Sequence, residues 1–236
     1  MDLRYPVAVL SGGLGTRMAQ RTGPHLPKAL LPVAGRPFID HKLIELRRAG
    51  AQRVILLTGH GSDELAAHVG DGAAFGLTAE LVPDGDRLLG TGGAIRRALA
   101  HLGEVFWVTF GDTLLAVPML EIEATFDAAG LDGVMTVLEN HDRWDVSNVA
   151  VAEGKVVEYR KGAPPSSFAF IDYGMSLLRA DAFLAYPEGE AFDLSSVLQG
   201  LIAAGRLGAA PVGRRFFEIG SESGFADTEA FLRGAS

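Results

Sequence analysis

The stretch Leu10-Ser-Gly-Gly-Leu-Gly-Thr-Arg-Met18 directly follows an apolar run at residues 5–10. This order predicts a first β-strand at residues 7–10 that opens into a glycine-rich turn and then a helix. Glycine lets the backbone approach a phosphate closely, and a helix N-terminus favours negative charge. Arg17 and Lys28 add two cations that can face the same phosphates. The N-terminal part of the chain therefore predicts nucleotide binding.

The rest of the first half alternates between strand and helix patterns. Strands are predicted at residues 7–10, 54–58, 79–82, 105–110 and 133–138, and helices at 39–49, 62–69 (with Ser62 as N-cap), 93–102 and 118–129. This repetition predicts an α/β fold with a Rossmann-like, mostly parallel sheet flanked by helices on both faces.

After about residue 140 the sequence becomes strand-rich. Strands are predicted at residues 148–152, 155–159 and 171–178, and helices at 192–204 and 225–232. No long linker or fixed-period repeat divides the chain. We therefore expect a single domain at residues 1–236, with a nucleotide-binding half at about 1–138 and a smaller half at about 139–236.

Composition limits the classes of partner. The 236 residues carry a formal net charge of −8, which argues against a nucleic-acid or anionic membrane surface. The chain has no cysteine, which excludes disulfides and thiolate metal sites. It shows neither a signal-peptide cleavage pattern nor an uninterrupted apolar run of about 18 residues. We expect a soluble cytoplasmic protein.

Polar or glycine-rich segments follow several predicted strands. Residues 11–17, Thr58-Gly-His60 and Gly111-Asp112 stand at strand ends, where an open parallel sheet binds ligands. Asp112 is placed to hold Mg²⁺ beside the phosphates, although a turn or helix-cap aspartate fits the same pattern. Gly90-Thr-Gly-Gly-Ala94 is predicted as a second glycine-rich turn, either approaching a nucleobase or ribose or simply turning the chain.

The ordered set GGxGTRM, Pro27-Lys28, GTGGA and FGD resembles the sugar-1-phosphate nucleotidyltransferase family. Further matches, which extend the resemblance from residue 7 to about 232, are Asn148-Val-Ala-Val, Tyr159-Arg-Lys161, Ile171-Asp-Tyr-Gly174 and Phe217-Glu-Ile-Gly220. The resemblance implies the nucleotide-diphospho-sugar transferase fold. It also implies attack of a sugar 1-phosphate oxygen on the α-phosphorus of a nucleoside triphosphate, with release of pyrophosphate. Such a reaction depends mainly on positioning and charge neutralisation.

The resemblance assigns roles on the nucleotide side. Arg17 would hold the β- and γ-phosphates, Lys28 would bridge the α-phosphate and the attacking phosphate, and Asp112 would hold the cofactor Mg²⁺. Glu218 matches the second metal ligand, where the family usually has the shorter aspartate. The implied nucleotide-binding residues are Leu10, Ser11, Gly12, Gly13, Gly15, Thr16, Gly90, Thr91, Gly92 and Gly93.

On the acceptor side, Lys161 matches the lysine that neutralises the sugar phosphate, although Arg-Lys-Gly replaces the usual Glu-Lys-Pro. The amide of Gly174 would meet the sugar. Asp172 and Glu139 can accept hydrogen bonds from sugar hydroxyls, and Asn148 is expected near the pocket. The alternatives are loop carboxylates for the two acids and a strand-end turn for Asn148.

The start LSGGLGTRM and the segment Phe170-Ile-Asp-Tyr-Gly174 resemble the heptose 1-phosphate guanylyltransferase branch and mannose-1-phosphate guanylyltransferase-like chains. This implies GTP as donor, a heptose or mannose 1-phosphate as acceptor, and a product used for a capsule polysaccharide. The family often assembles as homodimers or homotetramers.

The composition selects neither base nor sugar. Uridylyl, thymidylyl or cytidylyl transfer to another sugar phosphate or to phosphocholine therefore stays open. A non-catalytic regulatory homologue that senses sugar nucleotides is a further alternative. Retention of Arg17, Lys28, Asp112 and Lys161 argues against it, whereas Glu218 favours it.

Overall fold

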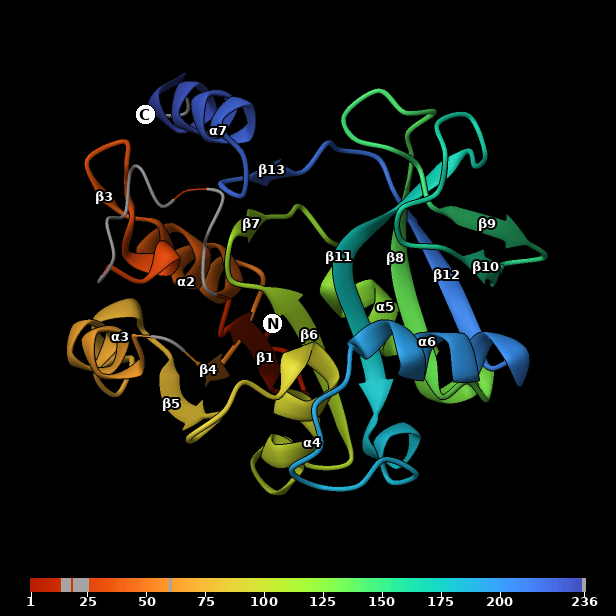
Figure 1. Cartoon of the computed structure of the whole chain (residues 1–236), viewed down its shortest axis with the longest axis horizontal. Coiled ribbons are helices and arrows are strands. Elements are labelled where there is room, and N and C mark those ends of the chain that lie inside the picture. Colours follow the sequence, from red (N-terminus) through yellow and green to blue (C-terminus); the bar gives the residue numbers. More distant parts are fainter. Residues whose placement is uncertain (14–17, 19–25, 60, 235–236) are drawn as a thin grey trace.

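The fold is taken from a computed structural model that describes residues 1–13, 18, 26–59 and 61–234. The strands of its main sheet are β1 (Val7–Ser11), β4 (Arg53–Thr58), β5 (Thr78–Pro83), β6 (Val105–Phe110), β8 (Gly133–Glu139), β9 (Val149–Ala152), β10 (Lys155–Tyr159), β11 (Phe170–Arg179) and β12 (Leu207–Val212). Among the described residues these nine strands form one sheet in the order β5-β4-β1-β6-β11-β8-β12-β10-β9 (Figure 1). The predicted α/β class is confirmed.

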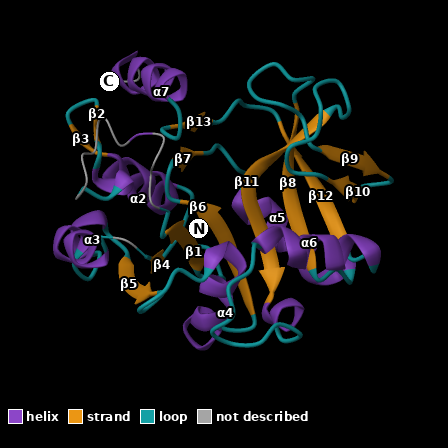
Figure 2. Ribbon diagram, in the orientation of Figure 1, coloured by secondary structure: helices purple, strands orange, loops and turns teal. Residues whose placement is uncertain are grey.

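Helices cover both faces of the sheet (Figure 2). They are α2 (Phe38–Arg48), α3 (Ser62–Val69), α4 (Gly90–Leu102), α5 (Met119–Phe126) and α6 (Leu194–Ala203), with 3-10 turns η2 (Lys28–Leu30), η3 (Ala73–Phe75), η4 (Asp127–Ala129) and η5 (Ala180–Phe183). Helix α7 (Glu222–Gly234) lies apart from the main sheet and packs with a separate cluster that includes Val33, Leu114 and Ile219. The apolar sides of α4 and α6 pack with alternate strand residues such as Ala8 and Phe106. Those of α2, α3 and α5 pack with the intervening residues, such as Val7 and Trp107. No described helix is long and apolar enough to cross a membrane.

The two halves of the sheet differ in strand direction. β5, β4, β1 and β6 run parallel, as predicted. β11 then pairs antiparallel with both β6 and β8, and its register with β8 shifts between Asp172 and Ser176. β12, which the sequence pattern did not predict, inserts parallel to β8 and antiparallel to β10. The mostly parallel sheet is thus a property of the first half.

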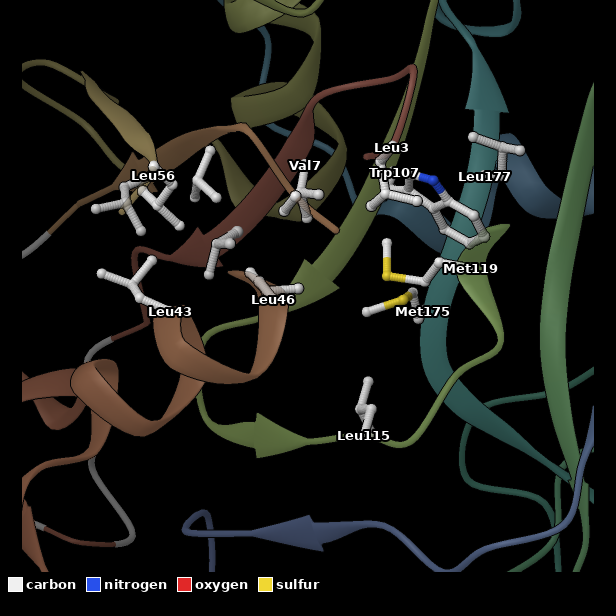
Figure 3. Packing of buried hydrophobic residues seen from close by; sticks show 14 of the residues in the cluster. Leu3, Val7, Leu43, Leu46, Leu56, Trp107, Leu115, Met119, Met175 and Leu177 are labelled. Carbon is white, nitrogen blue, oxygen red and sulfur yellow. The ribbon is translucent and has the colours of Figure 1, made fainter. Parts of the chain in front are cut away.

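Trp107, in the middle of β6, is fully buried in the larger core cluster. Figure 3 shows its indole above Met119 and Met175. The indole Nε1 donates to Glu123 Oε1 at 2.9 Å, so the polar end of this large side chain is satisfied. Trp107 therefore has the packing role expected from its mid-strand position.

Short ladders outside the main sheet bring distant segments together. β2 (Pro32–Val33) pairs with β3 (Arg36–Pro37), and β7 (Thr113–Leu114) pairs antiparallel with β13 (Phe217–Glu218). Glu218 lies opposite Thr113, and Ile219 N donates to the Asp112 carbonyl at 3.0 Å. The backbone next to Glu218 is consequently fixed beside Asp112.

Several predicted boundaries are wrong for identifiable reasons. α3 is preceded by Gly61 in a left-handed conformation, so Ser62 is not the N-cap; its hydroxyl instead bonds that of Thr58 at 2.7 Å. α4 begins at Gly90 rather than residue 93, so the predicted second glycine turn is the first turn of this helix. The helix predicted at 192–204 begins at Leu194, after Asp193.

Candidate functional site

A cavity of about 380 Å³ lies at the carboxyl ends of β1 and β6. The predicted site residues that line it are Leu10, Ser11, Gly12, Gly13, Lys28, Gly90, Thr91 and Asp112. They come from four separate parts of the chain (10–13, 28, 90–91 and 112), which the sheet brings to one edge. Gly15, Thr16 and Arg17, also predicted for this site, lie outside the described residues.

The hydroxyl of Ser11 is a buried polar group at the cavity wall. Ser11 Oγ makes no hydrogen bond with any described residue. Buried polar atoms in native proteins nearly always have a partner, and this Oγ is itself shielded from solvent. Ser11 therefore contributes to the wall of the cavity.

Other lining residues were not among the individual site residues predicted from the sequence. Ala29, Leu57, Leu88, Ala94 and Phe110 make part of the wall apolar, and Met18, Asp84, Gly111 and Gly220 also line it. Asp84 directly follows β5, so the rule that strand ends carry the site could have found it. Gly220 could not be placed, because it reaches the cavity through the short β7–β13 ladder.

The two predicted catalytic groups that the structure describes are in contact. Lys28 Nζ donates to Asp112 Oδ2 at 2.7 Å, a charge-assisted hydrogen bond. Lys28 opens η2, and Asp112 follows β6. The lysine and the aspartate, predicted to act on the same phosphates, are therefore held at one point of the cavity.

The residues predicted to hold Mg²⁺ differ in how well they fit. Asp112 offers a carboxylate to the cavity, where the ion's remaining ligands could be phosphates and water. Glu218 turns its carboxylate to the start of α7: Oε1 accepts from Ser221 Oγ at 2.5 Å, and Oε2 accepts from the amides of Gly220 and Ser221. No cluster of three or more histidine or acidic groups suited to a metal occurs among the described residues. The fit rests on Asp112.

Gly92 and Gly93, predicted to contact the nucleotide, pack closely against the segment before α6. Their amides donate to the Phe192 carbonyl at 3.0 and 3.3 Å. A Cβ on Gly92 would stand 2.3 Å from the Phe192 ring, and one on Gly93 would stand 2.5 Å from the Glu190 carbonyl. Neither residue lines the cavity, so this pair serves the contact with the segment before α6.

Three predicted acceptor-side residues form one hydrogen-bonded cluster. Asp172 N donates to Asn148 Oδ1 at 2.9 Å, and Gly174 N donates to Asp172 Oδ1 at 3.0 Å. Burial raises the pKa of Asp172, against the opposing effect of hydrogen bonds from Gly174 and Tyr159 and of the charge on Lys161. The amide of Gly174, predicted to meet the sugar, is therefore bonded to Asp172.

Lys161 is paired with a residue that the sequence reading missed. Lys161 Nζ donates to Asp193 Oδ1 at 2.7 Å, and the same oxygen accepts from Ser195 N at 2.8 Å. Burial alone would raise the pKa of Asp193, but the hydrogen bonds from Lys161 and Ser195 outweigh it and lower the pKa to about 2. An aspartate just before an apolar helix is the usual N-cap signal, which could have identified Asp193.

Glu139 stands apart from these groups. It ends β8, and its exposed carboxylate is 2.9 Å from His141 Nε2. It does not line the cavity. The structure thus brings Lys28 and Asp112 together on one side, and Asn148, Asp172 and Gly174 together on the other.

Comparisons with known proteins identify the family and the fold. Residues 7–161 match the family described as MobA-like NTP transferase domain. A mannose-1-phosphate guanylyltransferase from Mycobacterium tuberculosis is 38% identical over 115 residues, which are 48% of this chain and 32% of that protein. An N-acetylmuramate alpha-1-phosphate uridylyltransferase from Caulobacter vibrioides is 29% identical over 220 residues, 87% of this chain and 88% of that protein.

Among solved structures, HddC from Yersinia pseudotuberculosis complexed with GMP-PN superimposes with a TM-score of 0.80 and 25% identity. The match covers 97% of this chain and 99% of that one, so the fold is shared over its whole length. The chain spans only 26% and 32% of the first two curated relatives that it matches.

Proposed function

The chain belongs to the MobA-like NTP transferase domain family, and on this basis we propose that it transfers a nucleotidyl group from a nucleoside triphosphate to a sugar 1-phosphate. The observation that carries the proposal is the Lys28–Asp112 pair, which faces a cavity at the ends of β1 and β6. A lysine, a carboxylate and glycine-rich backbone at such an edge suit a triphosphate. The names of the two relatives above describe nucleotidyl transfer to a sugar 1-phosphate, which supports the same reaction for this chain.

In this reaction an acceptor phosphate oxygen forms a bond to the α-phosphorus of the triphosphate. The bond from the α-phosphorus to the bridging oxygen breaks, and its electron pair leaves with pyrophosphate. Lys28 would contact both the α-phosphate and the acceptor phosphate, reducing their repulsion as they align. The cavity-lining backbone of Gly12 and Gly13 would donate to the phosphates, and Arg17 would hold the departing pyrophosphate.

We assign Mg²⁺ to Asp112. When bound, the ion would supply positive charge to the triphosphate. In the structure the Lys28 ammonium group is bonded to the Asp112 carboxylate. If that carboxylate held the ion, Lys28 would donate to phosphate oxygens instead. Glu218 would reach the same place only after giving up its hydrogen bonds to Ser221, so we assign it a secondary role.

For the base we favour guanine, because of Asp84. This aspartate is 6% exposed and lines the cavity, where its Oδ2 accepts from Leu89 N at 3.0 Å. Guanine presents two adjacent N–H donors on one edge, which suit a carboxylate. Uracil and thymine present one donor between two carbonyls, and cytosine and adenine pair a donor with an acceptor. A carboxylate therefore favours GTP, consistent with the guanylyltransferase relative and with HddC bound to GMP-PN.

A uridylyltransferase is the second candidate. It is favoured by the Caulobacter vibrioides relative, which matches this chain over 87% of its length. The acceptor would be a heptose or mannose 1-phosphate in the first case and another sugar 1-phosphate in the second. Use of the product for a capsule polysaccharide, and assembly as a homodimer or homotetramer, stay predictions.

The test is an activity matrix. GTP, UTP, CTP and dTTP are each combined, with Mg²⁺, with the 1-phosphates of mannose, heptose, glucose and N-acetylmuramate and with phosphocholine, and pyrophosphate release is measured. We expect release with GTP and a heptose or mannose 1-phosphate. Release with UTP alone would select the second candidate. Nucleotide binding without release from any pair would identify a non-catalytic homologue.

A further inference from the structure

The segment at residues 189–194, which we call the bridging segment, is attached to the first turn of α4. In addition to the amides of Gly92 and Gly93, which donate to Phe192, the Phe192 amide donates to the Leu89 carbonyl at 3.0 Å. Leu194 N donates to Thr91 Oγ1 at 2.8 Å. Figure 1 shows this part of the chain passing beside α4 before α6 begins. The bridging segment is thus fixed on the turn whose Gly90 and Thr91 line the cavity.

Asp193 is the residue of the bridging segment that faces the acceptor side. Its Oδ1 accepts from Ser195 N in the cap of α6 and from Lys161 Nζ. The cap fixes the carboxylate, because the helix amide is part of a rigid element. Lys161 itself follows β10 on a turn and has a half-exposed side chain. A long, exposed lysine samples many rotamers unless a partner restricts it.

We propose that Asp193 is a positioning residue: it holds the Lys161 ammonium at a defined place relative to the nucleotide cavity, ready for the acceptor phosphate. The proposal rests on the proposed function, which gives Lys161 that phosphate as its ligand. An ammonium has three donors, so Lys161 can keep its bond to Asp193 and still donate to a phosphate. Water and salt screen the repulsion between Asp193 and the phosphate at this exposed position. The hydrogen bond from Lys161 to Asp193 still orients the ammonium group.

The test uses Asp193→Asn, because asparagine caps a helix as well as aspartate does. This change keeps α6 intact and removes the negative charge that holds Lys161. We expect the KM for mannose 1-phosphate, or for the acceptor that the activity matrix identifies, to rise about tenfold while the KM for the triphosphate is unchanged. Glu190→Gln is the matched control, since it removes one exposed negative charge from the same segment and is expected to change neither constant.

A double-mutant cycle with Lys161→Ala shows whether Asp193 acts through Lys161. Asp193→Asn should have almost no further effect in the Lys161→Ala background. An equal effect in both backgrounds, or an unchanged or lower acceptor KM in Asp193→Asn alone, would overturn the proposal.

Direct binding separates this proposal from the proposed function. Calorimetry of the whole chain with mannose 1-phosphate, in the presence of a non-hydrolysable triphosphate, measures acceptor affinity without turnover. Weaker binding by Asp193→Asn would support the positioning role even if no nucleotidyl transfer occurred. Equal binding by both proteins, or no binding by the wild type, would overturn it.

Discussion

Two lysine–aspartate pairs of equal length, 2.7 Å, lie in the two halves of the molecule, but their surroundings differ. In the cavity pair, the Lys28 and Asp112 side chains are 13% and 35% exposed; in the acceptor-side pair, Lys161 and Asp193 are 50% and 46% exposed. A shielded pair keeps a strong local field, whereas an exposed pair is screened by water and salt. The two pairs have the same N–O distance, but the difference in their exposure predicts different roles. The cavity pair is suited to neutralising charge during the reaction, and the exposed pair is suited to orienting an incoming group.

The largest effect should follow from breaking the cavity pair at its lysine. Lys28→Ala is expected to lower kcat by about 100-fold or more, because charge stabilisation in a shielded site is worth that much. Pyrophosphate release measures kcat, and thermal unfolding shows whether the fold is kept. Lys155→Ala, which removes an exposed lysine from β10, is the control. A near-normal kcat in Lys28→Ala would remove this lysine from the catalytic machinery.

Breaking the same pair at Asp112 should change the dependence on metal. Asp112→Asn is expected to raise the Mg²⁺ concentration for half-maximal activity by about tenfold, because an amide is a poorer ligand than a carboxylate. Glu218→Gln is the comparison, since its carboxylate bonds Ser221. It should lower the melting temperature and leave the Mg²⁺ titration near that of the wild type. If the two variants shifted the titration equally, Glu218 would have to be a ligand as well.

A third substitution tests whether Asp84 in the cavity determines which base is accepted. Asp84→Asn is expected to lower kcat/KM for GTP by about tenfold or more, because asparagine replaces one acceptor oxygen with a donor. The KM for the acceptor should not change. An unaltered ratio of GTP to UTP activity would contradict the role given to Asp84.

The smallest effect concerns the exposed pair and pH. The pKa of Asp193 in the folded protein is about 2, below the ordinary 3.8, so its charged form stabilises the fold at neutral pH. That contribution is lost as pH falls from about 4 to about 2, because the carboxylate takes up a proton. The difference in unfolding free energy between wild type and Asp193→Asn, below about 1 kcal/mol for an exposed pair, should therefore shrink below pH 4. Urea unfolding at pH 7 and pH 3.5 measures it; a constant difference would contradict the assignment.

The parallel half of the fold could be predicted because its signals are local. Strands buried on both faces have continuous apolar runs, as in β4 and β6. β12 could not be predicted in this way, since its sequence LGAAPV contains glycine, alanine and proline, which are poor strand formers. It is a strand because β8 and β10 provide neighbours on both sides.

The candidate site divides in the same way. The cavity lies where the sequence predicts a site, because Gly12, Gly13 and Asp112 stand at strand ends, and the family predicted from the motifs is confirmed. The packing of Gly92 and Gly93 could not be predicted, because the sequence GTGGA is typical of a turn whereas these glycines lie in α4 against Phe192, about a hundred residues away. Asp193 was missed for the opposite reason: its local cap signal was taken for helix interior.

The insertion of β12 between β8 and β10 has a consequence for synthesis on the ribosome. β8 and β10 leave the exit tunnel well before residues 207–212, so each presents an unpaired edge until β12 arrives. The four parallel strands β5, β4, β1 and β6 have by then been translated in full. We therefore expect stalled chains that end before residue 207 to protect the first half from protease and to leave the second half open. Gly220, which also lines the cavity, is translated after β12, so the cavity wall is completed only when the second half of the chain has emerged.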